Sequence, residues 1–118
     1  MAKVAVIVLA DPGTIESLGR VVNAMMAVKE LQEAGDTVQL IFDGAGTKWV
    51  AELSSPDHSY GGLFRSVKGR VIGACSYCAN AFGATEAVAR HGLALVGDYE
   101  GHPSFRKLVS EGYQVITF

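Results

Sequence analysis

The sequence predicts an α/β protein: one three-layer domain in which helices cover both faces of a five-stranded, mainly parallel sheet. Three observations predict it. Short apolar runs alternate along the chain with segments of helical periodicity. The first run, residues 4–10, is apolar at every position, as in a strand buried on both faces. The 118 residues, 49% of them hydrophobic, are enough for one core, so we expect a single domain over residues 1–118.

The first half of the chain contains two strands and two helices. After the first strand comes an Asp-Pro-Gly turn, and Thr14 stands where a side chain caps a helix. Apolar residues then recur at helical spacing until Gly35, a residue suited to the end of a helix. The run Thr37–Phe42 predicts the second strand. A shorter helix with Trp49 on its apolar face follows and stops at a Ser-Ser-Pro sequence.

The second half begins with a loose segment over residues 57–62, rich in turn formers and glycine. Cys75 comes directly after the third predicted strand, and Ser104 is placed to cap the last helix. The expected elements are a helix at 63–68, a strand at 70–74, helical pieces at 80–82 and 85–91, a strand at 93–96, a loop at 97–103, a helix at 104–111 and a strand at 114–118.

Strands that alternate with helices are joined by right-handed crossovers into a parallel sheet. We expect the flavodoxin-like strand order 2-1-3-4-5, in which the first and third strands flank the point where the order reverses. Functional residues collect beyond the carboxyl ends of strands at such a point. The segments placed there are residues 11–13 and Cys75–Cys78.

Charge and hydropathy exclude several classes of protein. Ten basic and twelve acidic residues give a net charge of −2, so we expect neither a nucleic acid nor a membrane surface as partner. The longest apolar run is too short to cross a bilayer. Two cysteines are too few for a disulfide-built secreted scaffold, and we expect a cytoplasmic protein with reduced thiols.

Cys75 and Cys78 are the main candidates for chemistry. Cys75 precedes a helix, whose N–H groups and dipole would lower its pKa and leave a nucleophilic thiolate within reach of solvent. The alternative is that both thiols only pack in the core. A structural zinc needs four ligands, this CxxC supplies two and no histidine has paired spacing, so we expect no metal. Disulfide exchange and persulfide transfer remain open.

Other polar residues contribute less to the prediction. His102 lies at the same predicted edge as Cys75 and could hold its thiolate or protonate a leaving sulfur, although the pattern favours a turn histidine that is hydrogen-bonded to the backbone just before a helix. Asp11 and Asp43 end strands and are read as turn and helix-cap residues rather than site residues. No glycine-rich phosphate loop is present, and we expect no cofactor.

The segment Ala74–Gly83, ACSYCANAFG, resembles the C-x-x-C-x-x-A-x-G segment of DsrE/DsrF-like proteins. The length, the five predicted strands and the final strand are similar too. This resemblance implies a small α/β fold, a homotrimer or hexamer, and relay of sulfur as a cysteine persulfide between donor and acceptor proteins. It places the persulfide on Cys75 and a second thiol at Cys78. The dipeptide Tyr77-Cys78 and the loop 97–104 depart from the relay subunits.

We therefore expect a sulfurtransferase-type carrier with Cys75 as the carrying thiol, Cys78 resolving or assisting, and His102 as a neighbour. Two alternatives stay open. One is a non-catalytic oligomeric binding or adaptor module of the same fold, and the other is a CxxC thiol–disulfide redox protein.

Overall fold

The computed structural model describes all 118 residues and contains a five-stranded sheet in which every strand pair is parallel. The expected α/β class is confirmed. The strands are β1 (Lys3–Val8), β2 (Thr37–Phe42), β3 (Val71–Cys75), β4 (Leu95–Val96) and β5 (Gln114–Thr117). The helices are α1 (Ile15–Glu33), α2 (Trp49–Ser54), α3 (Gly61–Val67), α4 (Ser76–Ala81), α5 (Thr85–Arg90) and α6 (Phe105–Ser110), with 3-10 turns η1 (Gly44–Lys48) and η2 (Lys68–Arg70).

The strand order is β4-β3-β2-β1-β5, so the expected order 2-1-3-4-5 is wrong. Strand β1 is an inner strand and pairs with β2 on one side and β5 on the other. Beyond β5, the Phe118 N–H donates to the Ile7 carbonyl at 2.8 Å and the Leu9 N–H donates to the Phe118 carbonyl at 2.8 Å. The first four strands therefore follow one another across the sheet, and only β5 returns to the far edge.

Alternate residues of each central strand enter two separate cores. In β1, Val6 packs with the larger core and Ile7 with the smaller one, because successive side chains of a strand point to opposite faces. In β2, Phe42 and Ile41 divide in the same way. Buried residues of α1, α2, α3 and α5 cover the larger core. In the smaller core, Leu108 of α6 is the buried residue that a helix contributes.

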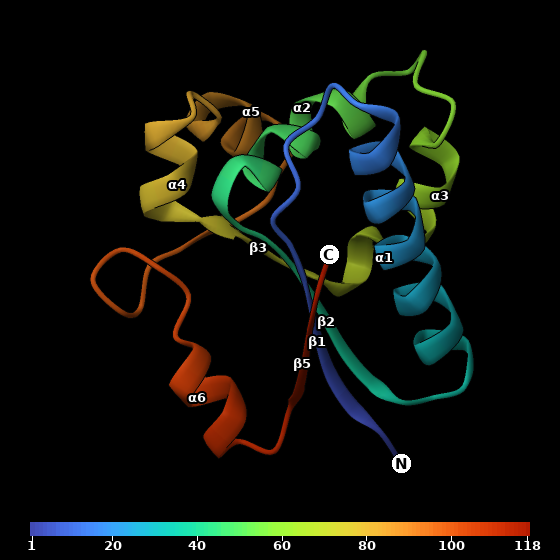
Figure 1. Ribbon diagram of the computed structural model, residues 1–118, viewed down its shortest axis with the longest axis vertical. Helices are drawn as coiled ribbons and strands as arrows, with labels where there is room; N and C mark the ends of the chain where they lie inside the picture. The colour runs from blue at the N-terminus through green and yellow to red at the C-terminus, as the bar shows by residue number, and fades with distance from the viewer.

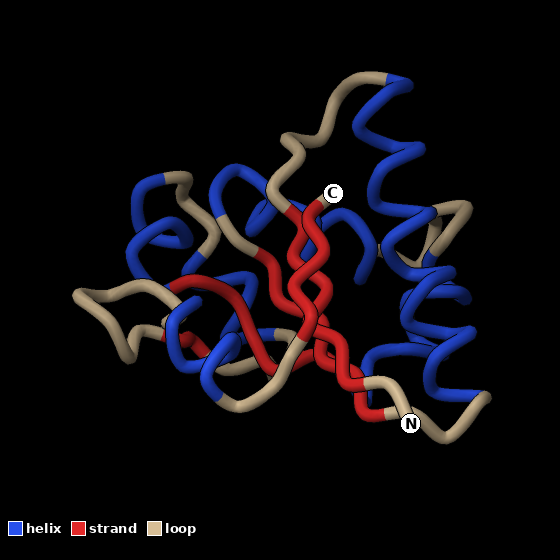
Figure 2. The backbone as a smooth tube through the Cα atoms, turned by 60° about the horizontal axis from the view of Figure 1, so that its bottom comes forward, coloured by secondary structure: helices blue, strands red, loops and turns tan.

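The handedness of the crossovers explains why the two cores differ in size. The connections from β1 to β4 each step across the sheet in one direction, so right-handed crossovers place their helices on one face. The return from β4 to β5 runs the opposite way and puts α6 on the other face. Figure 1 shows α1 and α3 on one side of the strands and α6 on the other, and Figure 2 shows the strands as the central layer. None of the helices has the length and apolar character that a membrane crossing requires.

Several elements differ locally from the sequence prediction. Strand β1 ends at Val8 rather than at residue 10, and β4 has only two residues. Helix α4 begins at Ser76, immediately after Cys75, although the sequence indicated helix only from residue 80. Helix α3 begins at Gly61, inside the segment expected to be loose. The early start of α4 matters most, because it places both cysteines at a helix N-terminus.

Candidate functional site

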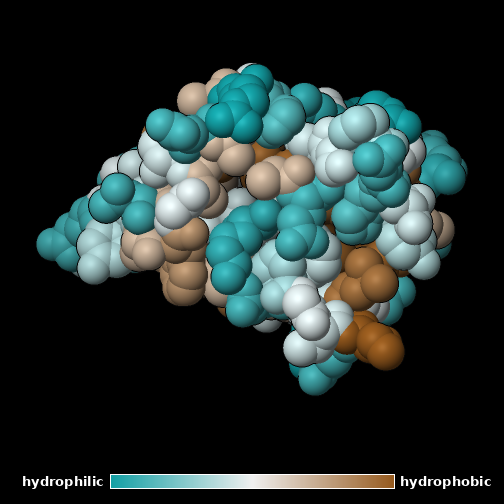
Figure 3. Space-filling model, turned by 90° about the horizontal axis from the view of Figure 1, so that it is seen from above, coloured by the Kyte–Doolittle hydropathy of each residue, from teal (hydrophilic) through white to brown (hydrophobic).

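The candidate site lies at the carboxyl ends of β2, β3 and β4. From β3 the chain continues into α4, which packs with α5 and η1, and from β4 it continues through the loop 97–104 to α6 on the opposite face. Neighbouring strands whose connections diverge in this way leave a crevice between them. The point where the connections change face therefore lies between β3 and β4. The sequence predicted it between the first and third strands. Figure 3 views this edge of the molecule, where apolar colour occurs only in separate small areas.

Four side chains from three separate segments meet there and form what we call the four-residue cluster. The Cys75 Sγ lies 3.3 Å from the His102 Nδ1, and the Cys78 N–H donates to the Cys75 Sγ at 3.4 Å. One nitrogen, sulfur or oxygen atom of each member lies within 4.8 Å of those of the other three. The members are Asp43, Cys75, Cys78 and His102.

A tight turn in the loop 97–104 holds His102 against α4. The Tyr99 and His102 backbones exchange two hydrogen bonds of 2.8 Å, with Gly101 between them at a φ of +87° that favours glycine. The Tyr77 N–H, in the first turn of α4, donates to the Gly101 carbonyl at 2.8 Å. The Tyr77 ring lies 4.7 Å from the His102 imidazole, centroid to centroid, at an interplanar angle of 33°. The imidazole is therefore fixed between a stacked ring and the Cys75 sulfur.

Cys75 is shielded from solvent although polar groups surround its sulfur. Its side chain is completely buried, and this burial raises the pKa of the thiol to about 12. The Cys78 backbone N–H lowers this pKa, while the hydrogen bond with the Cys78 side chain and the nearby Asp43 carboxylate raise it further. The expected solvent-accessible, low-pKa thiolate is thus wrong, because desolvation outweighs the N–H groups of the helix. Cys78 is only half-buried.

Asp43 is the site residue that the sequence analysis left out. It directly follows β2 and accepts the Gly44 N–H at 2.8 Å, so its predicted role as a cap is confirmed. It also faces the thiols, is only 7% exposed and forms no ion pair, whereas Asp11 pairs with Lys48 at 2.7 Å. The signal that could have found it was the adjacency of β2 and β3, which the wrong strand order concealed.

An open cleft adjoins the cluster on the α6 side. It has a volume of about 690 Å³, and both Asp43 and His102 line it. Tyr99, Phe105 and Arg106 complete much of its wall, so a cationic side chain and two aromatic rings surround the approach. A ligand in this cleft would meet the imidazole and the carboxylate, and the imidazole Nδ1 lies 3.3 Å from the buried Cys75 Sγ.

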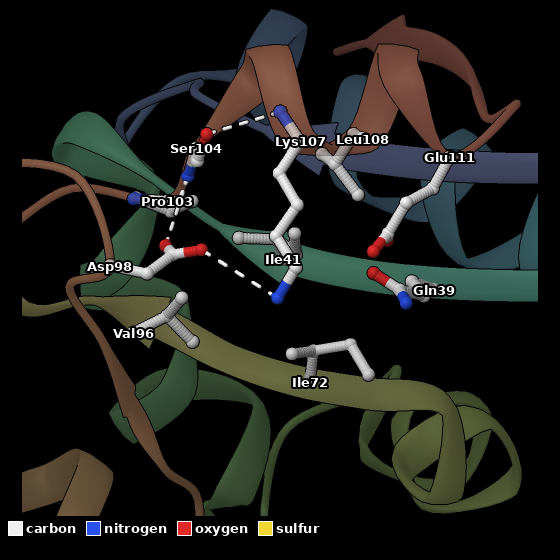
Figure 4. Close-up of a pocket in the computed structure, with 10 residues that line it drawn as sticks. All are labelled: Gln39, Ile41, Ile72, Val96, Asp98, Pro103, Ser104, Lys107, Leu108 and Glu111. Carbon is white, nitrogen blue, oxygen red and sulfur yellow. Dashed lines mark hydrogen bonds and ion pairs between the residues drawn. The ribbon is translucent and has the colours of Figure 1, made fainter.

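A second, smaller pocket of about 110 Å³ separates α6 from β2, β3 and β4 (Figure 4). Asp98 is one of the lining residues; it accepts the Ser104 N–H at 3.0 Å and lies 3.9 Å from the Lys107 Nζ. These contacts hold the start of α6 to the loop 97–104. No member of the four-residue cluster lines this pocket. We therefore assign its lining residues to positioning the loop 97–104 and not to the chemistry of the site.

Comparisons with known proteins identify relatives and a fold, but no activity. No protein-family model matches the chain. An uncharacterized protein of Methanocaldococcus jannaschii is 32% identical over 94 residues, which cover 80% of this chain and 76% of that protein. A solved structure of a conserved protein of unknown function from Bacteroides thetaiotaomicron superimposes with a TM-score of 0.64 over 97% of this chain and 94% of that one. At 17% identity, the second match shows a shared fold alone.

Proposed function

The chain belongs to one family with the uncharacterized Methanocaldococcus protein, and for this member we propose a sulfur-carrying, sulfurtransferase-type function. Cys75 would hold a sulfane sulfur as a persulfide, received from a donor protein and passed to an acceptor. The resemblance of the cysteine segment to DsrE/DsrF-like proteins first suggested this function. The observation that supports it best is the 3.3 Å separation of the Cys75 Sγ from the His102 Nδ1.

This pairing supplies a base to a thiol that is protonated at neutral pH. A weak nucleophile can be activated by a neighbouring base instead of by a low pKa of its own. Here the imidazole would take the Cys75 proton through Nδ1 as the sulfur attacks, so that a free thiolate never has to exist in the buried site. The stacked Tyr77 ring holds the imidazole in place for this transfer.

The transfer is balanced without an external oxidant or reductant. The Cys75 sulfur attacks the outer sulfur of a donor persulfide, R–S–SH, while its proton moves to His102. A new sulfur–sulfur bond forms at Cys75, the donor's sulfur–sulfur bond breaks, and the leaving R–S⁻ takes the proton from the imidazole. The products are the Cys75 persulfide and R–SH. Cys78, the less buried thiol, would assist release by taking the outer sulfur from the Cys75 persulfide through the same chemistry and passing it to an acceptor.

Aromatic side chains around the site suit a docking partner. Tyr77 is 61% exposed and Tyr99 is 62% exposed, and both flank His102. Tyrosine is enriched in protein interfaces because it combines a large contact area with few rotatable bonds. We propose that donor and acceptor proteins, or further copies of the chain in a homotrimer or hexamer, cover this surface.

The test is the intact mass of reduced, chelator-treated protein after exposure to glutathione persulfide, a donor small enough for the cleft. We expect one added sulfur atom that dithiothreitol removes. Cys75→Ser should abolish the addition, Cys78→Ser should retain it, and His102→Ala should slow it by about 100-fold or more because the base is missing. The variant His91→Ala, at a half-buried histidine outside the cluster, is the matched control and should load as the parent does.

Other outcomes would favour the alternative functions. Equal loading of the parent and Cys75→Ser contradicts the proposal. A loss of two hydrogens without added sulfur would indicate a Cys75–Cys78 disulfide and therefore a thiol–disulfide redox protein. No mass change in any variant would leave a binding or adaptor module as the better interpretation.

A further inference from the structure

We propose that the four-residue cluster is a binding site for a divalent metal ion of the zinc class. The fold supplies two sulfur atoms, one imidazole nitrogen and one carboxylate oxygen at a single point. Thiolate and imidazole ligands favour zinc and its borderline-soft neighbours, whereas calcium and magnesium select oxygen ligands. The donor set therefore defines the class of metal.

The separations between the donor atoms suit a tetrahedral site. Zinc–ligand bonds of about 2.0–2.3 Å place the corners of a tetrahedron roughly 3.3–3.8 Å apart. The Cys75 Sγ and the His102 Nδ1 are already 3.3 Å apart, and no pair in the cluster exceeds 4.8 Å. Closing the site therefore requires movements of about 1 Å or less, which side-chain rotation can supply.

The burial of Asp43 points independently to a cation. A carboxylate that is 7% exposed should be paired with a positive group or should coordinate a metal, because desolvating an isolated charge is costly. Asp43 forms no ion pair, and besides the Gly44 N–H its carboxylate has only the uncharged Cys75 thiol as a hydrogen-bond partner. Its carboxylate instead faces two thiols and an imidazole. A divalent ion at the centre of the cluster would compensate this charge.

Groups behind the ligands hold them in place. The Cys78 N–H donates to the Cys75 sulfur, the Gly44 N–H donates to the Asp43 carboxylate, and the Tyr77 ring stacks on the imidazole. Such outer contacts orient metal ligands and tune their basicity. The sequence argument against a metal counted the two thiols of the CxxC and found no histidine with paired spacing. The remaining two ligands come from the end of β2 and from the loop 97–104, distant in sequence but adjacent in the sheet.

Four protein ligands would fill a tetrahedral zinc site and leave no open position for substrate or water. Such a closed site is typical of a structural metal rather than a catalytic one. The bound ion would tie the loop 97–104 and α4 to the end of β2. This inference does not depend on sulfur carriage. A second consequence rests on the proposed function. If Cys75 also carries sulfur, its Sγ can bind either the metal or the sulfane sulfur, but not both at once.

The test is an anaerobic titration of the reduced, metal-free full chain with Co²⁺, without any sulfur donor. We expect one equivalent to bind, with the visible bands of tetrahedral cobalt and the near-ultraviolet bands of thiolate-to-cobalt charge transfer, and Zn²⁺ to displace it. Cys75→Ser or Cys78→Ser should weaken the charge-transfer bands. Asp43→Asn should lower the affinity by about 10-fold or more and keep those bands, since both thiolates remain.

The matched controls are Asp11→Asn, an exposed carboxylate in the turn after β1, and His91→Ala, a histidine outside the cluster; both should bind cobalt as the parent does. Far-ultraviolet circular dichroism of each metal-free variant shows whether it is folded, and only folded variants enter the comparison. Absence of charge-transfer bands in the parent, or equal cobalt affinity in the parent and Asp43→Asn, would overturn the proposed site. Sulfur loading is measured separately, so either proposal can fail while the other stands.

Discussion

Raising the pH should destabilise the metal-free protein through a single buried thiol, Cys75. Its pKa is about 12 in the folded chain against an ordinary value of 9.0, because burial opposes the charged form. The folded state therefore holds this proton more tightly than the unfolded state does. That contribution to stability is complete below about pH 9 and is lost as the pH rises towards 12.

The loss of unfolding free energy follows from the difference between the two pKa values of Cys75. At about 1.4 kcal/mol per unit, the full difference is on the order of 4 kcal/mol, and about 2 kcal/mol of it is lost by about pH 10.5. Urea unfolding of the reduced, chelator-treated protein at about pH 8 and about pH 10.5 measures this loss. Other groups also titrate in this range, so the informative quantity is the difference between the parent and Cys75→Ala.

The parent should lose about 2 kcal/mol more free energy of unfolding than Cys75→Ala between the two pH values. The control variant Cys78→Ala keeps the buried thiol and loses only the smaller contribution of the Cys78 side-chain hydrogen bond, so its loss should stay close to that of the parent. Equal losses in the parent and Cys75→Ala would refute the reasoning, since they would mean that Cys75 ionises as easily in the folded chain as in the unfolded one.

Two further predictions concern the parts of the fold that place the loop 97–104. Gly73→Ala puts a Cβ against the Ala94 carbonyl oxygen, closer than van der Waals contact allows. This variant should lower the free energy of unfolding by about 1–3 kcal/mol and abolish cobalt binding. The control Gly69→Ala, whose Cβ meets open space, should do neither. Leu108→Ala, at a residue 6% exposed beneath α6, should cost about 2–5 kcal/mol in urea unfolding. Val109→Ala, at the 65% exposed neighbour, should change stability by less than about 0.5 kcal/mol, and equal effects of the two would contradict the assigned role of α6.

Most of the secondary structure was predictable because it depends on neighbours in sequence. The Thr14 cap is present, with the Ser17 N–H donating to its side-chain oxygen at 3.0 Å, and α1 ends before Gly35 as expected. Helix α4 was predicted too short. Its segment has few large apolar residues to show a period, and its first turn is held by the contact of Tyr77 with Gly101, which lies outside the segment.

The sequence by itself determined that this chain builds a parallel α/β sheet and that Cys75 stands where a strand meets a helix, because hydrophobic period and capping are local properties. It also pointed to His102 at the same edge. Tertiary structure alone decided the strand order, because a strand's apolar pattern shows which faces are buried and not which strand pairs with it. That order brings Asp43 to the thiols and puts the crevice between β3 and β4. Burial, which depends on the whole fold, then makes Cys75 a protonated thiol instead of an exposed thiolate.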